Sequence, residues 1–147
     1  MITTVITPTQ RRLAVTLSGW FLGLVAYGLG SALFVDGSMS KGDVPALLIY
    51  TGVATLIEFF WCWFIVESIR DLRPRAISPA LCATVCGLSG AIGLTIWGLL
   101  MGVQKPSEFL TVAMTPAALL FVTAGVVFGL GLFGIRPRSL QARSARH

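Results

Sequence analysis

Four long apolar segments make up most of this chain and limit its fold more than any other feature. They cover residues 13–35, 44–69, 77–103 and 109–135. An α-helix needs about 20 apolar residues to cross roughly 30 Å of hydrocarbon, and each segment is at least that long. The alternation of polar and apolar residues that marks the strands of a membrane β-barrel is absent from the sequence. The sequence therefore predicts an all-α integral membrane protein, with four transmembrane helices arranged as two hairpins.

The low charge content supports the same fold class. Hydrophobic residues make up 55% of the 147 residues and charged residues only 12%, about half the share of a typical soluble domain. One small soluble core could not cover so much apolar surface. The length suits one domain, so we expect residues 1–147 to form a single four-helix unit. The first apolar segment is too long for the core of a cleavable signal peptide, so we expect it to be retained.

Basic residues are distributed unevenly between the ends of the apolar segments. The N-terminus, the middle loop and the C-terminal tail hold Arg11, Arg12, Arg70, Arg73, Arg75, Arg136, Arg138, Arg143 and Arg146. The other two loops hold only Lys41 and Lys105, beside Asp36, Asp43 and Glu108. By the positive-inside rule, both termini are expected to be cytoplasmic in a multi-pass protein of the plasma membrane. The net charge of +5 is then a topology signal, and nucleic acid is not an expected partner.

The C-terminal tail, residues 136–147, contains several arginines and no acidic residue. Arg136, Arg138, Arg143 and Arg146 are expected to lie against an anionic cytoplasmic leaflet, where each contributes about 1 kcal/mol. Docking of a cytoplasmic protein on the tail is the alternative interpretation.

The second half of the chain leaves two questions open. The fourth helix can begin near residue 109 and kink at Pro116, or begin with Thr115 as its N-cap and Pro116 in its first turn. Short echoes also relate the two halves, because residues 17–19 recur as 88–90 and residues 45–46 as 116–117. These echoes indicate either a duplication of one helical pair or chance similarity between apolar sequences.

Glu58 lies near the middle of the second apolar segment. An ionised carboxylate at the centre of a bilayer costs about 2.5 kcal/mol or more, so such a residue is a candidate functional site. Thr51, Thr55 and Cys62 share its face at helical spacing. This mildly polar face should therefore point into the bundle rather than toward lipid.

Three roles for Glu58 remain open. It can bind the coupling proton or cation of a transporter or channel, or act as a neutral acid hydrogen-bonded to Thr95, Thr123 or a backbone carbonyl. It can also meet a cation on a partner subunit. Glu67 differs, because it lies near the cytoplasmic end of the segment, one turn before Arg70. This spacing predicts a local ion pair.

Other chemistry is sparse in the apolar segments. Cys62, Cys82 and Cys86 are three thiols without a fourth ligand, and the single histidine is the terminal His147. We therefore expect no metal site and no cofactor such as haem. The chain has no Ser/His/Asp set, phosphate-binding loop or Cys-x-x-Cys motif, and its loops are too short for a catalytic domain. The sequence predicts that the protein is not an enzyme.

Small and aromatic residues mark surfaces for helix packing or partner contact. Pairs of glycines four residues apart occur at Gly19 and Gly23, Gly98 and Gly102, and Gly125 and Gly129. Such pairs let helix backbones approach closely, either within one chain or between chains. The second segment also carries a cluster of aromatic residues at Phe59, Phe60, Trp61, Trp63 and Phe64. Because the cluster surrounds the helix, some of its rings should face lipid, a bound ligand or a partner protein, with Trp63 as an interfacial anchor.

Two functions follow as hypotheses. The first is a small non-catalytic membrane protein that serves as a subunit or accessory factor of a larger assembly, in contact with lipid and with other subunits or itself. The alternative is a small oligomeric proton- or cation-coupled transporter or channel that uses Glu58. Four helices with one membrane glutamate are similar to the architecture of the small multidrug transporters. Those proteins are shorter and carry their glutamate in the first helix, so the similarity is limited to architecture.

Overall fold

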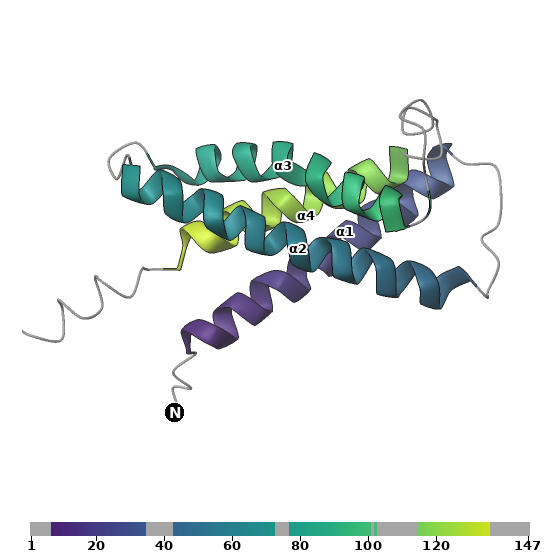
Figure 1. Cartoon of the computed structure of the whole chain (residues 1–147), viewed down its shortest axis with the longest axis horizontal. Coiled ribbons are helices and arrows are strands. Elements are labelled where there is room, and N and C mark those ends of the chain that lie inside the picture. Colours follow the sequence, from purple (N-terminus) through teal and green to yellow (C-terminus); the bar gives the residue numbers. More distant parts are fainter. Residues whose placement is uncertain (1–6, 35–42, 73–76, 101, 103–114, 136–147) are drawn as a thin grey trace, which may run out of the picture.

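The computed structural model describes residues 7–34, 43–72, 77–100, 102 and 115–135 of the chain. These residues form four α-helices: α1 (Pro8–Phe34), α2 (Asp43–Leu72), α3 (Pro79–Leu100) and α4 (Thr115–Phe133), shown in Figure 1. All four are long and apolar enough to cross a membrane. The all-helical fold predicted from the apolar segments is confirmed for this part of the chain.

Two helices begin at local capping signals rather than at the start of an apolar segment. At α1, the backbone N–H of Thr7 donates to Gln10 Oε1 at 2.8 Å, and the N–H of Gln10 donates to Thr7 Oγ1 at 3.3 Å. This reciprocal pair is a capping box, and Pro8 occupies the first helical position, where its missing N–H costs nothing. At α3, Ser78 accepts a hydrogen bond from the N–H of Leu81 at 3.1 Å.

The C-terminal end of α3 differs from the prediction. The helix ends at Leu100, and Gly102 lies beyond it with a φ of 79°. A left-handed glycine of this kind commonly ends a helix because it has no Cβ to clash. Gly98 is buried within α3, whereas nothing lies within 4 Å of a Cβ built at Gly102. The expected glycine pair at these two positions is therefore not a packing face of α3.

Helix α4 lies at the centre of the packing. Helices α1 and α3 both pack extensively on α4, and α2 packs on α3 and α4 but has few contacts with α1. In Figure 1, α1 runs obliquely to the other helices. The two pairs therefore pack differently, since α3 and α4 form a packed pair while α1 and α2 hardly meet. The prediction that the fourth helix can begin near residue 109 concerns residues outside the described part of the chain.

Glycines bring α1 and α3 close to α4. A Cβ at Gly23 would lie 2.8 Å from the carbonyl oxygen of Leu120, and one at Gly19 would collide with the ring of Phe128. On the other side of α4, a Cβ at Gly125 or Gly129 would collide with a backbone carbonyl of α3. Close backbone approach of this kind strengthens helix association in lipid through van der Waals contact.

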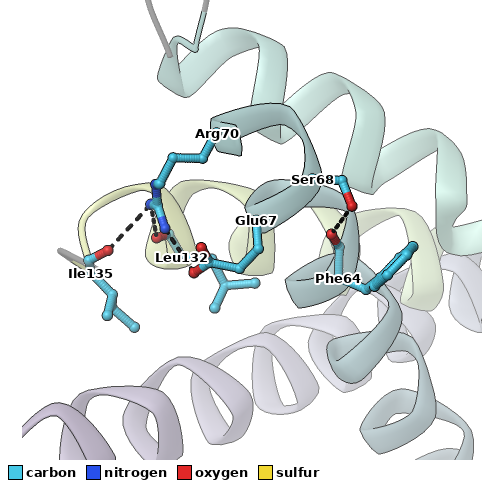
Figure 2. Close-up of polar contacts among 6 residues, drawn as sticks. All are labelled: Phe64, Glu67, Ser68, Arg70, Leu132 and Ile135. Atoms are coloured by element: carbon cyan, nitrogen blue, oxygen red, sulfur yellow. Dashed lines mark hydrogen bonds and ion pairs between the residues drawn. The ribbon is translucent and has the colours of Figure 1, made fainter. Parts of the chain in front are cut away.

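Arg70 joins the C-terminal ends of α2 and α4 (Figure 2). Its Nη1 lies 2.7 Å from Glu67 Oε1, which is the ion pair expected from the spacing. Its Nη2 donates to the carbonyl oxygens of Leu132 at 3.4 Å and Ile135 at 3.2 Å. A guanidinium at this position adds a donor at the C-terminal end of α4, where the carbonyl of Leu132 also accepts from the N–H of Ile135 at 3.2 Å, and it complements the negative end of the helix dipole.

Candidate functional site

The polar face of α2 points into the bundle. Thr51, Glu58 and Cys62 have no exposed surface, and Thr55 is 1% exposed. These four residues are spaced so that they follow one face of a helix with 3.6 residues per turn. The inward orientation expected from the sequence is therefore present along this part of α2.

The carboxyl group of Glu58 lies where α2, α3 and α4 meet. A Cβ built at Gly93 of α3 would be 2.9 Å from Glu58 Oε2, and one at Gly125 of α4 would be 2.9 Å from Oε1. The same position at Gly93 faces the ring of Phe121. Two glycines thus make room for the two oxygens of one carboxyl group.

Neither oxygen of Glu58 has a hydrogen-bond partner among the described residues. One hydroxyl proposed as its partner, that of Thr95, is exposed and donates instead to the carbonyl oxygen of Ala91 at 2.7 Å. Thr123 makes no hydrogen bond to Glu58 either. A buried polar group without a partner costs about 1–3 kcal/mol, so a role in fixing helix pairing is not supported here. Because the side chain is fully buried, a cation on a partner subunit cannot reach it in this arrangement.

Other polar side chains inside the bundle differ in whether they have a hydrogen-bond partner. Thr51 donates its hydroxyl to the carbonyl oxygen of Leu47 at 2.6 Å and accepts from Trp20 Nε1 at 3.4 Å. Thr55 Oγ1 and Trp97 Nε1 are buried without a partner in the described part of the chain. Arg12 Nε and the carboxyl group of Glu58 are also buried without a partner, so four side chains in this part of the chain carry unsatisfied polar groups.

The thiols of α2 and α3 meet one helical turn along α2 from Glu58. Each of Cys62 and Cys86 places its Sγ 3.9 Å from the carbonyl oxygen of the other. Cys62 Sγ also lies 3.4 Å from Ser89 Oγ, which itself donates to the carbonyl oxygen of Cys86 at 2.7 Å. All three cysteines, including Cys82, are buried and free. Among residues that the structure describes, no three His, Cys, Asp or Glu side chains are grouped so that they could hold a metal ion.

The aromatic cluster divides between the inside and the outside of the bundle. Phe59 is buried and packs edge-on against Phe128, with ring centroids 5.3 Å apart, so it is not free for lipid or a partner. The ring of Trp63 is covered by the Arg12 guanidinium, 4.2 Å from its centroid, so it contacts α1 instead of serving only as an interfacial anchor. Phe60 and Trp61 remain exposed. Their contact with lipid or a partner stays a prediction.

The remaining residues predicted from the sequence are the packing glycines and the arginines of the C-terminal tail. Gly19, Gly23, Gly125 and Gly129 are buried at the contacts with α4 and α3 described above. Arg136, Arg138, Arg143 and Arg146 lie outside the described residues. Sequence reasoning missed Gly93, Trp20 and Trp97. Gly93 could have been found, because it recurs every three residues with Gly87 and Gly90 along one face of α3.

Comparisons with protein-family models, with curated proteins and with solved structures find no match to this chain.

Proposed function

We propose that this protein moves protons across a membrane, as a small transporter or channel in which Glu58 takes up and releases the proton. The observation that supports this most is the carboxyl group itself, which is fully buried and has no hydrogen-bond partner in the described part of the chain. A group placed at such cost in the middle of a candidate span is more consistent with a functional role than with a structural one.

The surroundings of Glu58 favour a proton over a metal cation. A bound metal cation replaces its hydration shell with several oxygen ligands. The groups beside the carboxyl include the backbone of Gly93 and Gly125 and the ring of Phe121, and neither oxygen has a hydrogen-bond partner in the described part of the chain. A proton needs only one carboxylate oxygen and adds almost no volume between Gly93 and Gly125. The alternative of a coupling cation is therefore less well supported by this packing.

Proton flux into liposomes tests the proposal. We expect purified protein, reconstituted with a trapped pH-sensitive dye and a potassium diffusion potential, to acidify the lumen faster than empty liposomes do. Glu58→Gln should reduce this rate to that of empty liposomes, because the amide keeps the shape but cannot carry a proton. Glu67→Gln is the matched control, since Glu67 pairs with Arg70 at the helix end and is not fully buried. It should keep the rate of the unmodified protein.

Two results would contradict the proposal. One is a rate no higher than that of empty liposomes for the unmodified protein. The other is an unchanged rate in the Glu58→Gln variant, which would show that protons move without this carboxyl group.

Association with another membrane protein is the second candidate function, and a groove on the outside of the bundle favours it. The groove has a volume of about 400 Å³, lies between α3 and α4, and includes Ala83, Gly87, Ala91 and Ala118. Small residues on an outward face let a helix of another protein approach closely in lipid. The exposed rings of Phe60 and Trp61 offer further contact area on α2. In this case the chain is a non-catalytic subunit or accessory factor.

Filling this groove tests the second candidate. We expect the protein to co-purify from mild detergent with a specific membrane partner, and Ala91→Phe to release that partner. Ala32→Phe is the control, because Ala32 is equally exposed but lies on α1, away from the groove. Purification of the unmodified protein alone, or equal retention of the partner by both variants, would contradict association through this face.

A further inference from the structure

The N-terminal end of α1 and the C-terminal end of α4 form a groove on the outside of the bundle. The groove has a volume of about 390 Å³. Its lining includes one charged residue, Arg11, and otherwise apolar ones: Ala14 and Val15 of α1, and Leu130, Gly131 and Gly134 of α4. Small-molecule sites typically have volumes of about 300–1,000 Å³. This groove is therefore large enough for part of a ligand that has one anionic group.

Two glycines of α4 shape the groove. A Cβ at Gly131 would lie 2.5 Å from Val15 Cγ2, so α1 and α4 are in direct contact at this level. One turn nearer the end of the helix, a Cβ at Gly134 would meet only the carbonyl oxygen of Gly131, at 3.5 Å, among the described residues. Ala14 on the facing helix is small and exposed. The groove therefore widens toward the helix ends.

The polarity of the lining changes along the groove. Arg11, Ala14 and Val15 share one face of α1, because they are three and four residues apart. Arg11 lies nearest the N-terminus of the helix, and Val15 lies about 6 Å farther in at 1.5 Å per residue. Arginine near the end of a membrane helix extends toward the lipid headgroups. The groove thus offers a cation at headgroup depth and apolar side chains at the depth of acyl chains.

The three arginines that the structure describes differ in their partners. Arg12 points toward α2, where its guanidinium carbon lies 4.2 Å from the centroid of the Trp63 ring. Arg70 pairs with Glu67 and donates to carbonyl oxygens at the end of α4 (Figure 2). Arg11 is exposed, and its guanidinium has no ion pair or hydrogen bond among the described residues. Its charge is therefore available to an anionic ligand in the groove.

We propose that this groove binds one anionic phospholipid, with the phosphate on Arg11 and an acyl chain against Val15 and Leu130. A guanidinium has N–H groups in a planar fork that matches two oxygens of a phosphate. The first turn of α1 adds the positive end of its helix dipole. Basic pockets between membrane helices bind anionic headgroups in the same way. The inference does not depend on proton transport, because Glu58 is not part of this groove.

Lipid binding to the full chain in a neutral detergent tests the proposal. We expect native mass spectrometry to detect one dioleoylphosphatidylglycerol retained per chain, and this lipid to raise the midpoint of thermal unfolding, because it binds the folded protein. Dioleoylphosphatidylcholine has the same acyl chains but no net charge, and should bind at least about tenfold more weakly. Glycerol 3-phosphate supplies the phosphate without acyl chains, and should produce no shift of the midpoint at the same concentration.

Two pairs of variants locate the site. Arg11→Gln should weaken binding of phosphatidylglycerol about tenfold or more, since a charged hydrogen bond is lost. Arg12→Gln is its matched control, because it removes the same charge one residue away from a side chain that contacts Trp63. Ala14→Phe fills the groove and should also weaken binding. Its control is Ala32→Phe, which places the same ring on an exposed position of α1 outside the groove. Both controls should bind as the unmodified protein does.

Several results would overturn the lipid site. Equal binding of the two lipids would show that charge plays no part, and an equal shift with glycerol 3-phosphate would indicate a site for a free phosphate. Equal loss of binding in Arg11→Gln and Arg12→Gln would indicate general attraction to this end of the bundle. Unchanged binding in Ala14→Phe would place the lipid elsewhere. None of these measurements uses proton flux, so absence of flux would overturn the proposed function and leave the lipid site standing.

Discussion

Replacing Gly125 with valine is expected to separate α3 from α4 and lower the free energy of unfolding by about 3 kcal/mol or more. A Cβ at this position would collide with the carbonyl oxygen of Cys86 and lie 2.9 Å from Glu58 Oε1. The first obstacle is backbone, so no change of side-chain rotamer can remove it. The two helices must move apart, and close contact along their boundary is then lost.

The matched control for this substitution is Gly28→Val. Gly28 lies in α1, and a Cβ there has nothing within 4 Å. Both variants make the same chemical change in a helix, so helix propensity contributes equally to each. Unfolding of the purified variants in detergent, followed by circular dichroism during heating, measures the difference. A Gly125→Val variant as stable as Gly28→Val would show that α3 and α4 do not approach each other as closely as described.

The helices could be predicted because their signal is local. Length and apolar character alone identify a segment that can cross a membrane, and each of the four predicted segments overlaps such a helix. The inward direction of Glu58 was also predictable, because Thr51, Thr55 and Cys62 repeat at the helical period on its face. The early start of α1 could have been read from Thr7, Pro8 and Gln10, which together form a recognisable capping pattern.

The choice of neighbours could not be predicted in the same way. Glycine pairs occur in several segments, and a pair such as Gly19 and Gly23 fits any helix that offers suitable side chains opposite. Here Phe128 and Leu120 of α4 cover these glycines, so α1 packs on α4 rather than on its neighbour in sequence, α2. This match depends on the relative rotation and depth of two helices, which a single sequence does not encode locally.

The sequence also could not predict which polar groups of the site lack a hydrogen-bond partner, because this too depends on how the helices pack. Thr51 and Thr55 are the same residue type on the same face of α2, yet one donates to its own helix and the other has no partner among the described residues. Glu58 has plausible hydroxyl partners by sequence alone, and only the packing shows that Thr95 faces outward. Whether a buried polar group has a hydrogen-bond partner depends on which residues of other helices pack against it, so only the packed structure shows it.

Glu58→Met is expected to raise the free energy of unfolding by about 1–3 kcal/mol, although Glu58→Gln stops proton flux. Methionine has a volume close to that of glutamate and can follow the same path between Gly93 and Gly125. It removes a fully buried carboxyl group that has no partner among the described residues. Replacing an unsatisfied buried polar group with an apolar one of similar shape stabilises a fold, because no hydrogen bond is lost and a desolvation cost disappears.

The sign of this change distinguishes a functional glutamate from a structural one. A carboxyl group that holds helices together would make Glu58→Met destabilising, and the case for a proton-binding site would then lose its main support. Glu67→Met makes the same substitution where the carboxylate pairs with Arg70 at 2.7 Å, so we expect it to give no gain in stability. Stability is measured for all three proteins by heating in the same detergent. If removing Glu58 stabilises the bundle and abolishes flux, its presence is explained by function and not by stability. Buried polar groups without partners are found mainly at functional sites, where activity is gained at the expense of stability.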